Sequence, residues 1–441
     1  MLKVPYEEIK NKDLRKDIRR YLRTFDTLYS ELRKQGINVA DTCSDTSELK
    51  SELASLHVKV RNDGKSFVWG GISPSCLHCR TGEKSETFII SLKCNRDCYF
   101  CANKNQQDYS EPVSDVRNIK AEFDTVRARL GSLLSVGITG GEPLLFIDEC
   151  INFIEHVKLA DPSTQIRLYT NGDLADEAAL SKLSDAGLDE IRFGLKFDED
   201  GTISENLYDN LKAAVKYINR TMIEMPVMPG SYDEMKIVMD RAESMGVFSV
   251  NLLEFLFPWN NKESYSQKGF KIKRKPYRVL YGYDYAGGLP VDGSEKECLR
   301  LLKYAAENNF KTGIHYCSLE NKLTSQVWHR NSRVALADNE TFSHKDFFIK
   351  TAKAYGKDAV KVMNILEKAG LKNFHYVPEN RAAEFSVSDI RLLDKTKIEL
   401  GISSAIVEKG ENGWLLREVA IDGTDSKRFS TEDILGVNYA D

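Results

Sequence analysis

The chain has 441 residues, of which 41% are hydrophobic and 29% are charged. This composition is typical of a soluble globular protein with a sizeable core, and the length exceeds an ordinary single domain, so we expect one large domain with appendages. The net charge of −4 argues against a surface that binds bulk polyanions, and nucleic acid is an unexpected partner.

The apolar stretches of the chain are short. The longest fall far short of 18 residues, so no membrane span is expected, and the N-terminal residues lack the apolar segment of a secretory signal. Nine cysteines are too few for a disulfide scaffold in a chain of this length. Their clustering favours metal ligation in a reducing compartment, and we therefore expect a cytoplasmic protein.

The N-terminal part predicts helices. Across residues 6–35 apolar side chains recur at three- and four-residue steps between charged ones, which is typical of an amphipathic helix. Residues 46–57 predict a second helix. We expect residues 1–75 to form an N-terminal helical extension.

From about residue 86, short apolar strands alternate with amphipathic helices, which is typical of a parallel sheet covered by helices. The pattern predicts an α/β fold, a full or partial (β/α) barrel over residues 76–330, with catalytic groups at the C-terminal ends of its strands. The predicted strands are 87–92, 135–139, 165–169, 190–197, 222–227, 248–255 and 311–316. The helices predicted between them include 145–159, 177–186 and 205–218.

Two further segments follow the predicted barrel. Residues 331–380 predict a helical segment, with a helix at 345–369. Residues 381–441 predict a small β-rich unit, in which strands at 398–408 and 414–421 form a hairpin around a glycine-containing turn.

Three cysteines directly follow the first predicted barrel strand. Cys94, Cys98 and Cys101 have the spacing C-x3-C-x2-C. Three thiolates can hold three irons of a [4Fe–4S] cluster, which normally has four cysteine ligands, and the fourth iron is then open to a small molecule. This spacing therefore indicates chemistry more than structure.

A second motif follows the second predicted strand, where residues 140–143 read Gly-Gly-Glu-Pro. In this order the two motifs resemble the radical S-adenosylmethionine (SAM) superfamily, which also has an aromatic residue before the third cysteine, here Phe100. The resemblance covers roughly residues 85–320. It implies a [4Fe–4S] cluster on Cys94, Cys98 and Cys101, with SAM as second cofactor.

The resemblance also implies the chemistry. In the family, the amino and carboxylate groups of SAM bind the open iron, and an electron from the cluster cleaves SAM to methionine and a 5′-deoxyadenosyl radical. This radical abstracts a hydrogen atom from the substrate, while the protein places the cofactor and excludes side reactions. A reductant such as flavodoxin or ferredoxin is the implied partner.

The resemblance assigns SAM contacts to the following residues: Phe100, Gly140, Gly141, Glu142, Pro143, Asn171, Arg192 and Lys196. The two glycines let backbone approach the SAM amino group closely, and Glu142 holds the turn or the ammonium. Arg192 and Lys196 share one face of the fourth predicted strand, where the family more usually has Ser and Asp. The alternative is that both face solvent. Glu254 is a weaker candidate for substrate contact, and no catalytic residue is assigned.

A zinc ribbon is an alternative interpretation of the cysteines. Cys76 and Cys79 form a C-x2-C pair, and Cys98 with Cys101 forms a second one. A ribbon closes four sulfurs around a structural zinc ion. It leaves Cys94 and the Gly-Gly-Glu-Pro motif unexplained, and it predicts a non-catalytic binding module.

A second metal site is a further expectation. Cys76, Cys79, Cys298 and Cys317 meet if the last strand of a closed barrel neighbours the first. Four sulfurs suit zinc, a single iron or a second iron–sulfur cluster. The alternative is that some of these are ordinary buried cysteines, which pack as small hydrophobic residues.

The substrate is not defined by any motif. The absence of a βα domain ahead of the barrel argues against cobalamin-dependent methyl transfer, and no basic stripe indicates an RNA substrate. Our first hypothesis is radical modification of a peptide or protein, which includes maturation of a ribosomal peptide and activation of a glycyl-radical enzyme. The second is an enzyme that acts on a small metabolite.

Overall fold

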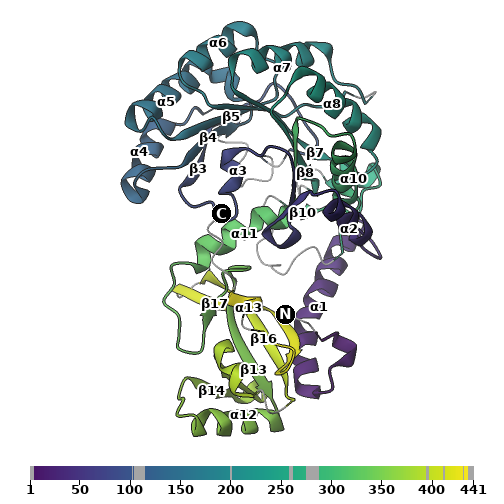
Figure 1. The fold of residues 1–441 in the computed structure, drawn as a ribbon, viewed down its shortest axis with the longest axis vertical. Helices are drawn as coiled ribbons and strands as arrows, with labels where there is room; N and C mark the ends of the chain where they lie inside the picture. The colour runs from purple at the N-terminus through teal and green to yellow at the C-terminus, as the bar shows by residue number, and fades with distance from the viewer. Residues whose placement is uncertain are drawn as a thin grey trace. The chain divides into compact units, whose positions relative to one another are not determined.

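The computed structural model describes residues 4–101, 103, 115–198, 201–257, 262–274, 288–393, 397–410, 413–430 and 432–435. The chain divides into two compact units (Figure 1). We call the one within residues 36–322 the barrel unit. The other takes in the residues before 36 and after 322, and we call it the antiparallel unit.

The barrel unit is built on one nine-stranded sheet in the order β1-β2-β11-β8-β7-β6-β5-β4-β3. Its strands are β1 (Lys59–Arg61), β2 (Ser66–Trp69), β3 (Ser85–Ser91), β4 (Ser135–Gly140), β5 (Gln165–Thr170), β6 (Glu190–Phe193), β7 (Arg220–Val227), β8 (Ser249–Glu254) and β11 (Gly313–Cys317). Neighbouring strands from β11 to β3 pair in parallel. Among the described residues β1 and β3 stay at opposite ends of the pairing order, so the predicted α/β barrel takes its partial, open form.

Helices connect the parallel strands and cover the outside of the curved sheet (Figure 1). They are α4 (Ile119–Leu130), α5 (Ile147–Ala160), α6 (Glu177–Asp185), α7 (Glu205–Tyr217), α8 (Tyr232–Met245) and α10 (Ser294–Glu307). The unit also contains α2 (Ser47–Ser55), α3 (Pro74–Leu77) and α9 (Lys262–Gln267). Local sequence sets the ends of several helices. The side chains of Asn118 and Asp176 accept hydrogen bonds from backbone N–H groups in the first turns of α4 and α6. Gly246 ends α8 at φ +75°, a conformation that favours glycine.

Two strands at the start of the barrel unit were absent from the prediction. β2 pairs antiparallel with β11, and β1 pairs antiparallel with β2. The predicted boundary at residue 75 is therefore misplaced, because residues 59–69 belong to the barrel sheet. The last parallel strand neighbours β2 instead of β3, so the assumed barrel closure is also wrong.

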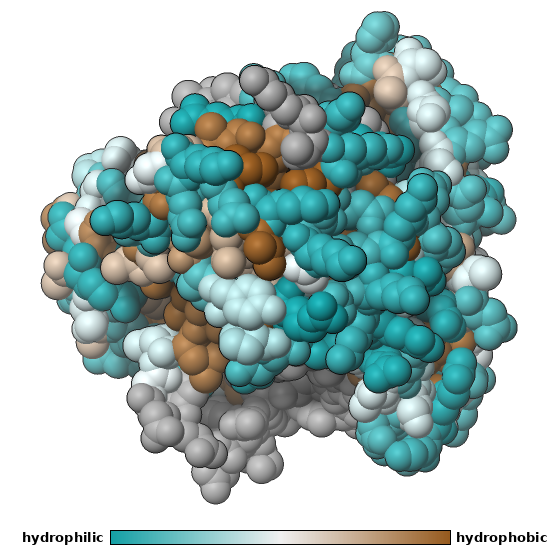
Figure 2. All heavy atoms as spheres, turned by 90° about the horizontal axis from the view of Figure 1, so that it is seen from below, coloured by the Kyte–Doolittle hydropathy of each residue, from teal (hydrophilic) through white to brown (hydrophobic). Residues whose placement is uncertain are grey.

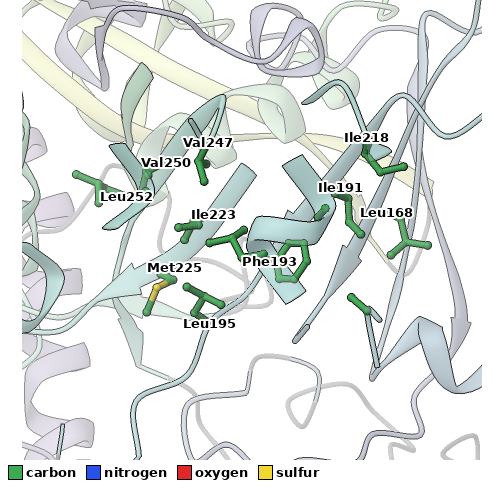
Figure 3. Packing of buried hydrophobic residues seen from close by; sticks show 14 of the residues in the cluster. Leu168, Ile191, Phe193, Leu195, Ile218, Ile223, Met225, Val247, Val250 and Leu252 are labelled. Carbon is green, nitrogen blue, oxygen red and sulfur yellow. The ribbon is translucent and has the colours of Figure 1, made fainter. Parts of the chain in front are cut away.

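The core of the barrel unit lies between the sheet and its outer helices. Figure 3 shows apolar side chains of β5 to β8 packed together, among them Ile191, Phe193, Ile223 and Val250. All four are fully buried. Burying a side chain of this size stabilises the fold by about 1.5–3 kcal/mol, and this layer holds the strands whose carboxyl ends form the site described below.

The antiparallel unit contains a six-stranded sheet in the order β14-β15-β13-β16-β17, with β12 paired to β13. Its strands are β12 (Thr341–Phe342), β13 (Ile349–Tyr355), β14 (Phe374–Val377), β15 (Ala382–Phe385), β16 (Glu399–Gly410) and β17 (Gly413–Asp425). Its helices are α1 (Lys12–Lys34), α12 (Lys357–Lys368) and α13 (Glu432–Leu435), and α11 (Leu319–Asn331) begins in the barrel unit. β16 and β17 confirm the predicted hairpin, although its turn lies outside the described residues.

The helix predicted at 345–369 is wrong in its first part. Residues 349–355 form β13, a central strand that is buried along its whole length. Its two lysines are buried and neutralised, since Lys350 pairs with Asp346 and Lys353 pairs with Glu384 and Glu418. Tertiary packing thus overrides the helical preference of this segment, and the β-rich unit begins well before residue 381.

One face of the molecule is predominantly polar. Figure 2 shows a face on which hydrophilic side chains predominate and hydrophobic ones form small separate groups. In the part of the chain that the structure describes, none of the helices combines the length and apolarity needed to cross a membrane.

Candidate active site at the carboxyl ends of the parallel strands

The three-cysteine loop begins directly after β3. Cys94 is exposed, whereas Cys98 and Cys101 are half-buried, and the backbone N–H of Cys101 donates to the carbonyl of Cys98 at 3.1 Å. Burial is the main cause that raises the pKa of both Cys94 and Cys98, and neighbouring thiols of the loop raise it further. The three sulfurs therefore lie close enough to influence one another.

Two glycines let the end of β4 pass against this loop. A Cβ on Gly140 would lie 2.1 Å from the carbonyl oxygen of Ser91, and one on Gly141 would lie 2.2 Å from that of Lys93. The backbone N–H of Gly141 donates to Ser91 at 2.9 Å. No other residue allows this approach, so the glycines are required by the cysteine loop itself, whereas the sequence analysis assigned them to SAM.

Glu142 is buried and joins two strand ends. Its Oε1 accepts hydrogen bonds from the N–H of Leu144 at 3.0 Å and the hydroxyl of Thr170 at 2.8 Å, and its Oε2 accepts from the N–H of Asn171 at 2.7 Å. Burial raises its pKa, although these hydrogen bonds oppose the shift. Of the two roles expected for Glu142, these contacts favour holding the turn.

Asn171 and Asp173 brace the cysteine loop from the end of β5. The side-chain amide of Asn171 donates to Asn95 at 2.6 Å, and the carboxylate of Asp173 accepts from the guanidinium of Arg96 at 2.5 and 2.6 Å. Sequence reasoning missed the Arg96–Asp173 pair. The two residues are 77 positions apart, so no local signal indicated it.

A cavity of about 350 Å³ connects the cysteine loop with the carboxyl ends of β4 to β8. Its walls include the three loop cysteines and six of the residues expected to contact SAM: Phe100, Gly140, Gly141, Asn171, Arg192 and Lys196. Glu142 and Pro143 lie outside this lining. Glu254, the weaker candidate, lies on it, together with Tyr169, Glu224 and Lys322, which the sequence analysis did not name. For Tyr169 and Glu224 the available signal was their place in parallel strands, whereas Lys322 lies in α11.

Arg192 in β6 and Lys196, three residues after the end of that strand, line this cavity, so the alternative that both face solvent is wrong. Arg192 is buried and donates to Glu190 and Glu224, each at 2.6 Å. Burial opposes the charge of Glu224, but Arg192 outweighs it and lowers the pKa of this carboxyl. Lys196 lies with its Nζ 5.2 Å from the ring centroid of Phe100, and burial lowers its pKa even though Cys98 opposes the shift.

The second group of cysteines comes together only in part. Asn321 contacts the sulfurs of both Cys79 and Cys317, and Cys76 lies beside Arg192. Burial raises the pKa of Cys317 to about 12, and the neighbouring Cys79 adds to the shift. Cys298 instead packs in the hydrophobic core of the barrel unit. The expected set of four cysteines is therefore wrong with respect to Cys298.

No ready-made metal site is present at either cysteine group: within the described ranges, no three His, Cys, Asp or Glu side chains are arranged around an ion position. The two C-x2-C pairs also have different surroundings. Cys76 and Cys79 contact Arg192 and Asn321, whereas Cys98 shares its loop with Cys101 and lies near Lys196. This arrangement gives no support to the zinc ribbon.

Residues 88–242 match the family model of the radical SAM superfamily. This part of the chain is a radical SAM domain. Members of this superfamily use a [4Fe–4S] cluster and SAM as cofactors. The matched residues run from β3 to α8 and therefore include both sequence motifs and most of the cavity wall.

A curated relative from Methanocaldococcus jannaschii, provisionally named a glycyl-radical enzyme activating enzyme, is 27% identical over 272 residues, which cover 60% of this chain and 67% of the relative. Among solved structures, Streptococcus suis SuiB bound to its precursor peptide SuiA aligns with 12% identity and a TM-score of 0.40, over 70% of this chain and 65% of SuiB. The methyltransferase TsrM from Kitasatospora setae aligns with 19% identity and a TM-score of 0.32, over 48% of this chain and 44% of TsrM. The chain thus spans 65% of SuiB and 44% of TsrM, which is less than two thirds of each.

Proposed function

We propose that this chain is a radical SAM enzyme in which Cys94, Cys98 and Cys101 hold a [4Fe–4S] cluster and the adjoining cavity holds SAM. The observation that carries the proposal is the cavity that joins the cysteine loop to the strand ends. Its volume of about 350 Å³ lies within the usual range for small-molecule sites, about 300–1,000 Å³. The proposed substrate is a protein, with a glycyl-radical enzyme as the specific candidate.

The residues present fit these cofactors. Three thiols on one short loop supply three iron ligands and leave one iron position without a cysteine. Asn171 and Arg96 fix this loop against the end of β5, and the glycines at 140 and 141 keep it close to β4. The ligands are thus held by backbone and by partly buried hydrogen bonds, as a cluster site requires.

The bound cofactors supply one-electron reductive chemistry that ends in abstraction of a hydrogen atom from the substrate. The chain contributes binding and orientation. Phe100 forms an apolar wall beside the cysteines, and the ammonium of Lys196 next to it offers a positive partner for a carboxylate. Glu142 keeps the ends of β4 and β5 in register without reaching the cavity.

The curated relative supports the choice of substrate, because its provisional name denotes action on another enzyme. A flavodoxin or ferredoxin is the proposed electron donor. The cavity wall also includes Arg192, Glu224 and Glu254, which carry charges of both signs. Such a wall suits the polar backbone of a polypeptide segment as well as its charged side chains.

The proposed cofactor chemistry is tested by 5′-deoxyadenosine formation in anaerobically reconstituted protein supplied with SAM and a reductant. We expect product with the wild type, none with Cys98→Ala, and unchanged product with the control Cys298→Ala, which alters a buried core cysteine. Equal product from Cys98→Ala and wild type contradicts the proposal. So does protein that contains zinc but no sulfide after reconstitution.

The proposed substrate is tested by adding an unactivated glycyl-radical enzyme and recording its electron paramagnetic resonance spectrum. A glycyl radical that depends on SAM and on Cys98 supports the proposal. If 5′-deoxyadenosine forms but only a small metabolite stimulates it, the enzyme is confirmed and the protein substrate is wrong.

A further inference from the structure

Three cysteines that play no part in the proposed cluster lie together on the barrel unit. The side-chain amide of Asn321 donates to Cys79 Sγ at 3.5 Å and to Cys317 Sγ at 3.4 Å. Cys76 lies one turn before Cys79, and both Cys76 and Cys317 are buried. Cysteines separated by about 240 positions are thus neighbours.

The strands that the sequence analysis missed explain this proximity. β2 pairs antiparallel with β11 and places Ser66 opposite Cys317. The chain then leaves β2 and forms α3, whose last turn carries Cys76 and leads to Cys79. Asn321 follows Cys317 in the first turn of α11. The group is therefore built where the N-terminal strand pair joins the parallel sheet.

Polar N–H groups surround these sulfurs. Besides Asn321, a guanidinium N–H of Arg192 approaches Cys76 Sγ at 3.5 Å, and the amide of Asn251 approaches it at 3.8 Å. A neutral thiol is only a weak hydrogen-bond acceptor, whereas the thiolate is the form that binds metals. These donors stabilise the thiolate form, whereas the burial of Cys79 and Cys317 opposes it.

Buried thiolates need a further positive charge, because isolated buried charges are costly. Arg192 meets this need only in part, since it contacts Cys76 and already pairs with Glu190 and Glu224 at 2.6 Å each. The soft divalent cations that bind several thiolates, above all Zn²⁺, meet this need. Cys298 does not contribute, because its sulfur lies in the hydrophobic core and approaches only the carbonyl of Leu253 at 3.9 Å.

We propose that Cys76, Cys79 and Cys317 bind one soft divalent metal ion, Zn²⁺ in the first instance, through three thiolates. The ion draws the three sulfurs together as the amide of Asn321 turns away from them, and a water molecule or another small donor completes the tetrahedral shell. Bound there, it ties α3 to the end of β11. This site is independent of the proposed radical chemistry, because it shares no ligand with the loop at Cys94, Cys98 and Cys101.

The test uses the full chain with Cys94, Cys98 and Cys101 changed to Ala, so that the cluster loop cannot bind the probe. Zn²⁺ is titrated in competition with a chromophoric chelator, and Co²⁺ is used to record thiolate-to-metal charge-transfer bands. We expect one ion per chain. Adding Cys79→Ser or Cys317→Ser should weaken binding by more than about tenfold, a loss that even an outer-shell change can cause, whereas adding Cys298→Ala should not.

A second measurement covers the case in which these variants fold poorly. X-ray absorption at the zinc edge of the parent variant should show zinc–sulfur distances of about 2.3 Å with three sulfur neighbours. The proposal is overturned if the parent binds no Zn²⁺ in excess of the Cys79→Ser variant. It is also overturned if zinc binds with nitrogen and oxygen neighbours alone, or if Cys79 and Cys317 are recovered as a disulfide.

Discussion

The carboxylate of Glu142 connects the ends of β4 and β5, because its Oε2 accepts the backbone N–H of Asn171 at 2.7 Å in a site that is 1% exposed. Residues 29 positions apart are thereby held at the base of the cysteine loop. Asn171 extends the connection, since its own amide donates to Asn95 within that loop.

Replacing Glu142 with Gln should destabilise the protein. The amide NH2 cannot accept the N–H of Asn171, and a buried donor left unpaired costs about 1–3 kcal/mol. Urea unfolding measures this change in the free energy of unfolding. The matched control is Glu149→Gln on the exposed start of α5, which should change stability by less than about 0.5 kcal/mol. Equal stabilities of the two variants would contradict the role assigned to Glu142.

Gly141→Ala should displace the cysteine loop, because the new Cβ would lie 2.2 Å from the carbonyl oxygen of Lys93. We expect less iron and sulfide per chain after reconstitution, with the circular dichroism of the barrel preserved. Gly71→Ala is the control, since its Cβ meets only the ring of Phe248 at 3.6 Å. Full cluster content in Gly141→Ala would show that the loop tolerates the displacement.

Arg192→Met should be strongly destabilising. It leaves two acidic groups, Glu190 and Glu224, in a buried site without their cation. Breaking a buried pair in this way costs about 3–5 kcal/mol. Arg241→Met removes a partly exposed pair with Glu205 and should cost at most about 1 kcal/mol. Denaturant unfolding measures the loss in the free energy of unfolding for both variants. Similar losses in Arg192→Met and Arg241→Met would argue against a buried ion-pair network around Arg192.

Lys196→Met should make the reduction potential of the proposed cluster more negative. A positive charge beside Cys98 stabilises the more negative, reduced state, and removing it takes that stabilisation away. A redox titration monitored by electron paramagnetic resonance measures the midpoint potential of the cluster. Lys196→Arg keeps the positive charge and should have the midpoint potential of the wild type. A midpoint that is the same in all three proteins would assign Lys196 to substrate or SAM binding alone.

The stability contribution of Glu243 should depend on pH. Burial opposes its charge, but the backbone N–H groups of Lys311 and Thr312 donate to it at 3.0 and 2.8 Å and lower the pKa of Glu243 below its ordinary 4.5. The unfolded chain therefore takes up the proton first on acidification. The contribution is complete above pH 4.5 and disappears as the pH falls through the lowered pKa.

Unfolding of wild type and Glu243→Gln at neutral pH and at a pH below that range measures this effect. Wild type should be the more stable protein at neutral pH, and the difference should shrink in acid. A difference that grows on acidification would reverse the assigned sign.

Local sequence predicted much of the barrel, because strand and helix periodicity acts over a few residues. The hairpin of β16 and β17 was predicted for the same reason. β13 was misassigned, since its lysines are buried only through ion pairs, and the partners of Lys353 come from other strands. β2 was missed because four residues followed by two glycines carry too short a pattern.

The sequence by itself determined the superfamily and the cysteine loop, because spacing along the chain fixes which ligands can share one small cluster. Tertiary structure alone decided which distant groups meet: Arg96 with Asp173, Arg192 with Glu224, and Cys79 with Cys317. These contacts depend on strand order and register, and on burial that makes charge pairing necessary. Neither property can be read from the spacing of residues along one chain.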